Sequence, residues 1–134
     1  MKHPTSYGPD KAVVAFWALL CCPPALVCGY LFATAPTLEM GSQLLLTLVF
    51  PVAPILFASR FRATFASSEF IYRRWGPTVR VPYSQIERID VTNVTPVGKQ
   101  PIGAFIITTG GEKLPFWPKL FSREAVNRFL ALAD

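Results

Sequence analysis

The sequence predicts an α+β protein in two parts: an apolar helical segment, then a small antiparallel β domain that ends in one helix. Charge and periodicity predict this class. Residues 12–59 carry a single charged side chain, Glu39, whereas residues 60–134 carry eleven basic and six acidic side chains. Beyond residue 60, apolar and polar side chains alternate with a period of two, which is typical of half-buried strands. The chain therefore divides near residue 59.

The helical part follows a polar N-terminal tail, residues 1–11. Residues 12–35 form a run of 24 residues without a charge. At about 1.5 Å per residue, this run makes roughly 36 Å of helix, which is enough to cross a bilayer with some tilt. A second uncharged run, from about residue 40 to 58, is close to the minimum length for a span. We therefore predict a transmembrane helical hairpin with helices at about 12–35 and 40–58.

Charges flanking these runs predict their orientation. Lys2 and Lys11 precede the first run, and Arg60 and Arg62 follow the second, whereas the connecting loop carries only Glu39. Because basic residues are retained on the cytoplasmic side, both termini are expected in the cytoplasm and the loop outside. The charges therefore predict a two-pass protein of a plasma membrane.

Prolines and cysteines interrupt the apolar runs. Pro23 and Pro24 in the first run, and Pro51 and Pro54 in the second, predict bent helices, which membranes tolerate. A break of this kind could also line a pore, which leaves open a small transporter or channel accessory subunit. The three cysteines lie in the first run, where an odd number without nearby ligands predicts packing residues rather than disulfides or a metal site: Cys21, Cys22 and Cys28.

The second part, residues 59–134, is predicted to contain six strands and a C-terminal helix at 122–133. The strands are expected at about 61–66, 69–75, 78–83, 87–93, 103–109 and 113–117. Trp75-Gly76-Pro77 and Gly110-Gly111 have the composition of hairpin turns. Ser84 to Glu87 has the spacing of a capping box and predicts one helical turn. Pro115 places the last strand at a sheet edge, and Ser122 is the expected N-cap of the helix.

Three stretches together resemble a known family. They are EFIYRRWGPTVRVPYSQIERIDV, the hairpin GAFIITTGGEKLPF and the terminal helix SREAVNRFLALA. They resemble the bacterial pleckstrin-homology-like (PH-like) domain proteins that carry an N-terminal two-helix transmembrane hairpin. The resemblance implies a partly open β barrel or sandwich capped by a helix, no enzymatic activity, and a role as a binding or assembly module. It also implies that the plasma membrane in question is the inner membrane of a bacterium. Eukaryotic lipid-binding PH domains place basic residues in the first inter-strand loop. Here that loop is expected at Ser67-Ser68, which has none, so phosphoinositide recognition is not implied.

No constellation of catalytic residues is recognisable, and neither a cofactor nor a metal site is predicted. The only histidine, His3, lies in the tail, and Glu87 and Asp90 alternate across a strand rather than forming an acid/base pair. The candidate contact surface is a basic turn with an aromatic residue. Its members are Arg73, Arg74, Trp75 and Arg80, and further lysines lie elsewhere, at Lys99, Lys113 and Lys119. These cations either contact anionic lipid headgroups or simply keep the strand ends in solvent.

Three functions follow as hypotheses. The first is a non-enzymatic, membrane-anchored PH-like module that scaffolds a protein complex at the cytoplasmic face, with an unknown membrane or cytoplasmic protein as partner. The second is a module that senses anionic lipid or the cell envelope through the basic turn. The third is the transporter or channel subunit. The lipid bilayer is the expected partner in each, whereas nucleic acid and a small-molecule substrate are not expected, because aromatic and basic residues are not interleaved as on RNA-binding sheets.

Overall fold

The computed structural model describes residues 4–94 and 101–133 and divides the chain into two compact units. The helical unit comprises residues 11–59. The β unit comprises the described residues of 1–10 together with those of 60–134. The chain thus leaves the β unit after residue 10 and returns to it at residue 60. Each unit is described by itself.

The helical unit contains four helices in which α1 contacts α4 and α2 contacts α3. Their bounds are α1 Lys11–Leu20, α2 Pro23–Thr34, α3 Leu38–Thr47 and α4 Val49–Ser59. The predicted bend near Pro23 and Pro24 is confirmed, since the run bends by 50°. The prediction of one continuous helix over 12–35 is wrong, because the run breaks at Cys21-Cys22 into two helices. Pro23 and Pro24 begin α2, where a missing N–H costs little. The prolines therefore start a new helix instead of kinking the old one.

The second run behaves differently. Here α3 and α4 form one helix of 22 residues, Leu38–Ser59, which begins two residues earlier than predicted. Its most apolar 18-residue window has a mean hydropathy of 1.8. Pro54 lies inside α4 without ending it. By length and composition this is the one helix among the described residues that could cross a membrane. The bent pair α1–α2 passes the same test only if its two helices count as a single span.

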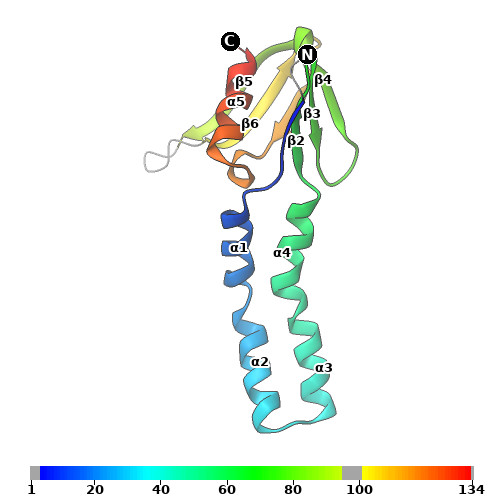
Figure 1. Cartoon of the computed structure of the whole chain (residues 1–134), viewed down its shortest axis with the longest axis vertical. Coiled ribbons are helices and arrows are strands. Elements are labelled where there is room, and N and C mark those ends of the chain that lie inside the picture. The colour runs from blue at the N-terminus through cyan, green and yellow to red at the C-terminus, as the bar shows by residue number, and fades with distance from the viewer. Residues whose placement is uncertain (1–3, 95–100, 134) are drawn as a thin grey trace. The chain divides into compact units, whose positions relative to one another are not determined.

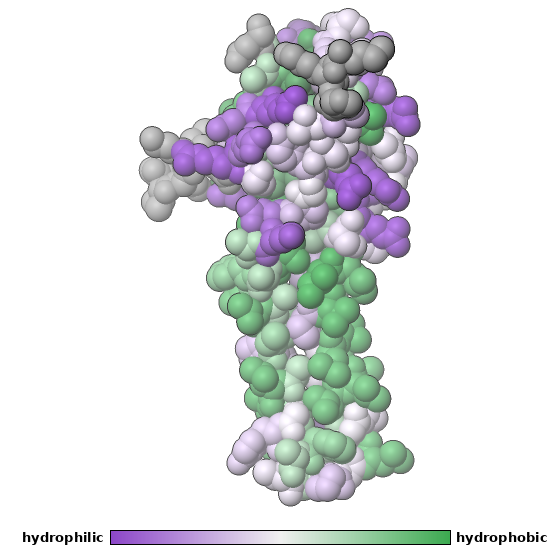
Figure 2. Space-filling model, in the orientation of Figure 1, coloured by the Kyte–Doolittle hydropathy of each residue, from purple (hydrophilic) through white to green (hydrophobic). Residues whose placement is uncertain are grey.

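Apolar side chains of the helical unit are largely exposed. Leu26 is 70% and Leu45 70% exposed, and none of the most apolar 18-residue window of Leu38–Ser59 is buried. In Figure 2 hydrophobic residues dominate the visible surface of the helices, whereas hydrophilic residues gather over the β unit. The three cysteines are partly buried and free. Large apolar side chains therefore make up much of the surface of this unit.

The β unit contains two antiparallel sheets (Figure 1). The first has the order β1-β2-β3-β4, with bounds Thr5–Tyr7, Arg62–Phe65, Glu69–Arg73 and Val79–Pro82. The second has the order β5-β6-β7, with bounds Ile86–Val94, Pro101–Thr108 and Lys113–Phe116. Tyr83–Gln85 forms the single 3₁₀ turn η1 expected near Ser84, and β7, which contains Pro115, is an edge strand as predicted.

The strand β1 was not predicted from the sequence. Residues 1–11 were treated as a tail, yet Thr5, Ser6 and Tyr7 pair with Phe65, Thr64 and Ala63 of β2. Three residues are too few for a period-two pattern to be visible. Ser6 and Thr64 also share a hydrogen bond of 3.0 Å between their hydroxyls. The described residues therefore hold seven strands rather than six, and Ser67-Ser68 connects the second strand to the third, not the first to the second.

One core joins both sheets to the C-terminal helix α5, Arg123–Leu130. Aromatic rings dominate it: Phe116 and Phe129 stack with centroids 4.0 Å apart, and Phe70 contacts both. Ser122 caps α5 as predicted, since its hydroxyl accepts from the Ala125 N–H at 3.4 Å. The helix continues as the 3₁₀ turn η3, Ala131–Ala133. The prediction of an α+β chain whose β part is closed by a terminal helix is thus confirmed at this level.

Candidate functional site

The predicted basic turn lies between β3 and β4, which pair in antiparallel register. Inward and outward side chains alternate along β3, so that Phe70 and Tyr72 are buried while Arg73 is exposed. The connection spans residues 74–78 and contains Gly76 at a φ of +108°, a conformation that L side chains rarely adopt. Trp75 is 53% exposed. The turn therefore presents an indole ring beside arginines.

The four predicted residues do not form one cluster. Arg80 lies on the outer face of β4 opposite Ile71, and its guanidinium lies 3.6 Å from the Glu69 carboxylate. Arg80 is therefore partly neutralised and lies away from Trp75 along the sheet. Arg73 faces Arg62 of β2 in direct register. Two like charges placed opposite each other repel, so an anion bound near this pair would be stabilising.

Arg74 and Trp75 make different contacts. The Arg74 side chain is half-buried, and its Nε has no hydrogen-bond partner within the described part of the chain. The guanidinium carbon of Arg60 lies 5.6 Å from the centroid of the Trp75 ring, a cation–π distance. From the sequence alone, Arg60 indicates only the orientation of the predicted spans. No local pattern could join two residues fifteen positions apart, because only the pairing of β2 with β3 brings them together.

Burial shapes the titration of one nearby tyrosine. Burial raises the pKa of Tyr72 to about 12, and the backbone of Trp117 and the charge of Arg74 oppose this rise. The backbone of Trp117 is the polar group that lies beside the Tyr72 hydroxyl. Burial also raises the pKa of Tyr83, with a smaller opposing effect from Arg128. Both tyrosines therefore stay neutral at physiological pH.

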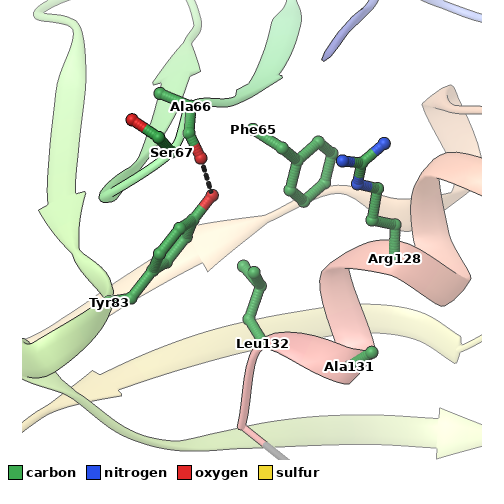
Figure 3. Close-up of a pocket in the computed structure, with 7 residues that line it drawn as sticks. All are labelled: Phe65, Ala66, Ser67, Tyr83, Arg128, Ala131 and Leu132. Atoms are coloured by element: carbon green, nitrogen blue, oxygen red, sulfur yellow. Dashed lines mark hydrogen bonds between the residues drawn. The ribbon is translucent and has the colours of Figure 1, made fainter. Parts of the chain in front are cut away.

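A cavity of about 280 Å³ opens near the start of β3, away from the basic turn (Figure 3). Two of its polar side chains, Tyr83 and Arg128, already have partners in the protein. The Tyr83 hydroxyl donates to the Ala66 carbonyl at 2.8 Å, and Arg128 lies 5.3 Å from the Phe65 ring centroid. Arg128 also contacts the Tyr7 hydroxyl at 3.5 Å, and that hydroxyl donates to Glu124 at 2.7 Å. These contacts tie β1 and the β2–β3 turn to α5, so we assign the cavity to the fold.

The remaining candidates are not part of the β3–β4 connection. Asp90 accepts a hydrogen bond from Arg88 at 3.1 Å. Lys113 and Lys119 are exposed, whereas His3 and Lys99 lie outside the described residues. Within the described ranges, no group of three or more His, Cys, Asp or Glu side chains is placed to hold a metal ion. The arrangement at the turn therefore suits contact with an anionic or amphipathic surface.

No protein-family model matches this chain, and the comparison with curated proteins finds no similar sequence. The PH-like resemblance consequently rests on the motifs quoted above.

Proposed function

We propose that this chain is a non-enzymatic binding module of PH-like type, anchored in a bacterial plasma membrane by a pair of helical spans. The exposed apolar surface of the helical unit supports the anchor. Leu38–Ser59 has 22 residues, about 33 Å of helix at ~1.5 Å per residue, which matches the hydrocarbon core of a bilayer. In water, the exposure of so many large apolar side chains would be unfavourable.

The observation that carries the proposal is the pairing of β1 with β2. Tyr7 lies opposite Ala63, and partners in an antiparallel pair have Cα atoms about 5 Å apart. A segment that leaves a strand and returns to its neighbour must cross a membrane an even number of times. One crossing by Leu38–Ser59 therefore requires a second. Lys11–Leu20 with Pro23–Thr34, bent by 50°, is the apolar segment available for it.

The arrangement of the β unit supports the PH-like part of the proposal. Seven described strands in sheets of four and three, closed by a C-terminal helix, agree with the partly open barrel or sandwich that the resemblance implies. This chain differs in carrying its whole helical unit between the first two strands. Lys11, Arg60 and Arg62 flank that unit and favour a cytoplasmic β unit. The partner of the module is then a cytoplasmic or membrane protein at that face.

Contact with anionic lipid is the second candidate function, and Arg60 over Trp75 favours it. A basic residue near an anionic leaflet contributes on the order of 1 kcal/mol. The side chains Arg60, Arg62, Arg73 and Arg74 would together make such contact strong enough to matter. Arg80 is removed from this set by its pairing with Glu69.

Labelling of single cysteines in the full-length chain tests the anchor. The three native cysteines are replaced by alanine, and one cysteine is introduced at Ser6, Ser68 or Ser42. Ser6 and Ser68 belong to the β unit, whereas Ser42 lies in α3 near the α2–α3 connection. In intact bacterial cells, a membrane-impermeant maleimide should label Ser42→Cys alone. In inverted vesicles it should label Ser6→Cys and Ser68→Cys.

Labelling of all three positions from one side would contradict two crossings. Labelling of Ser6→Cys and Ser68→Cys from opposite sides would contradict the pairing of β1 with the rest of the β unit. The detergent-solubilised variants serve as the control, because all three exposed positions should then react.

A further inference from the structure

Two connections of the β unit lie at the end where the chain joins the helical unit. At the first, the β3–β4 connection, the Trp75 ring lies 5.6 Å from the guanidinium of Arg60. At the second, the segment after β7, the ring of Trp117 stacks on Phe61 with centroids 5.7 Å apart. Arg60 and Phe61 are the first two residues after Ser59, the last residue of α4. Both tryptophans therefore lie within one side-chain contact of the point where the chain returns from the helices.

The outgoing chain meets the same end of the β unit. The Asp10 N–H donates to the Leu120 carbonyl at 2.8 Å, and Pro9 forms an isolated bridge with Phe121. Leu120 ends the 3₁₀ turn η2, Pro118–Leu120, which directly follows Trp117. Since Asp10 precedes Lys11, the first residue of α1, the segment after β7 lies beside both chain connections to the helices.

This end combines aromatic and basic side chains. Trp75 and Trp117 are each 53% exposed, and Arg60 and Lys119 are exposed as well. Indole rings favour the headgroup level of a bilayer because they have an apolar body and one N–H donor, and basic side chains pair there with phosphates. An aqueous surface would gain nothing from exposing two tryptophans at one end.

We propose that Trp75 and Trp117, with Arg60 and Lys119, form a membrane-facing rim that seats the β unit on anionic phospholipid headgroups. This rim rests on the proposed membrane anchor. Its occupant is the leaflet in which the helical unit is anchored, because residues of the rim contact the residues that join the helices. The opposite end of β3 carries Ser67 and Ser68 instead, and it is separated from the rim by a strand of five residues, about 17 Å long.

Depth-dependent fluorescence quenching of the full-length chain in vesicles tests the rim. Three variants retain a single tryptophan, Trp17, Trp75 or Trp117, and the other two are changed to phenylalanine. A fourth carries Ser68→Trp and no other tryptophan. The vesicles contain phosphatidylglycerol and phosphatidylcholine, with a nitroxide either on the headgroup or deep in the acyl chain. Circular dichroism checks that each variant is folded.

The rim predicts that Trp75 and Trp117 emit at shorter wavelength in vesicles than in detergent. It also predicts stronger quenching of both by the headgroup nitroxide than of Ser68→Trp. If Trp75 and Trp117 are quenched no more than Ser68→Trp while the lipid nitroxides quench Trp17, the rim is overturned. The proposed anchor would remain intact in that case. Quenching of only one of them would overturn a rim built from two loops. If Trp17 also escapes quenching by both lipids, the anchor fails and the rim with it.

Substitutions of the basic side chains test whether the rim recognises the anionic headgroup. Arg60→Gln and Lys119→Gln should each reduce the blue shift of the nearer tryptophan in anionic vesicles. Lys113→Gln, at the far end of β7 from Trp117, should not. High salt should weaken the effect of the anionic lipid. Inorganic phosphate added to the protein in detergent should leave the emission unchanged, and a shift would assign the site to free phosphate instead of lipid.

Discussion

The helical unit and the β unit use the same kinds of apolar side chain in opposite ways. In the β unit Phe70, Phe116 and Phe129 are fully buried in one core, whereas in the helical unit Phe16 and Phe50 are more than half exposed. The β unit therefore hides its rings from water, whereas the helical unit leaves rings of the same kind at its surface. Because the proposed anchor would place these exposed rings in lipid, the same substitution should have different consequences in the two units.

A matched pair of Phe→Ala changes gives the largest expected difference. Phe129→Ala removes a ring that stacks 4.0 Å from Phe116, and such core truncations cost about 3–5 kcal/mol of unfolding free energy. Phe50→Ala removes a ring of α4 that is 56% exposed, and exposed substitutions change stability by about 0.5 kcal/mol or less. Urea unfolding of the full-length protein in mild detergent, followed by near-ultraviolet circular dichroism, measures both. Equal losses would contradict the contrast between the units.

A buried tyrosine gives the next largest effect, which depends on pH. The pKa of Tyr72 is raised from 10.0 to about 12 in the folded state, so the neutral form is favoured by folding. This contribution to stability is fully present below pH 10 and is lost as the pH rises towards 12. Two pKa units correspond to about 2.7 kcal/mol. The free energy of unfolding should therefore fall over this range.

The variant Tyr72→Phe is the matched control for that fall. It keeps the ring and removes the buried hydroxyl, which lies beside the Trp117 backbone, so at pH 8 its free energy of unfolding should differ by no more than about 1.5 kcal/mol. Between pH 10 and 12 it should lose less stability than the natural chain. Parallel curves for the two proteins would show that Tyr72 is not the group responsible. Tyr83, whose pKa is also raised, contributes to both curves alike.

Much of the fold follows from local pattern, and its failures have physical causes. Alternation predicted β2 to β7 to within a few residues, because each strand has one face on a shared core. The exposed ends of these strands lie in turns whose glycines and prolines are readable in the sequence. By contrast, β1 consists of three residues, Thr5–Tyr7. It pairs with β2, from which the whole helical unit separates it in sequence. A contact of that range leaves no local signal.

The candidate site shows the same limit. Arg73, Arg74 and Trp75 adjoin one another in sequence and were predicted together, and the turn does present Trp75 to the surface. Arg80 was included because it lies nearby in sequence, but strand alternation and Glu69 separate it from the turn. Arg60 and Trp117 were omitted because only tertiary pairing brings them to the same end of the β unit. The break at Cys21-Cys22 likewise depends on how Pro23 and Pro24 start a helix.

The smallest expected effect concerns the outer face of the first sheet, which borders water instead of core or lipid. Arg80 and Glu69 are 3.6 Å apart with side chains 67% and 28% exposed, so Glu69→Gln should cost about 0.2–1 kcal/mol. Glu87→Gln, on β5, removes an exposed carboxylate for which the described residues show no ion pair, and it should cost less. At about 1 M salt the screening length falls to roughly 3 Å, and the difference between the two variants should vanish. A difference that persists at high salt would mean that this face is shielded from water. The outer face of the first sheet would then be covered by a partner. The comparison of the two units would have to include this covered face as a third kind of surface.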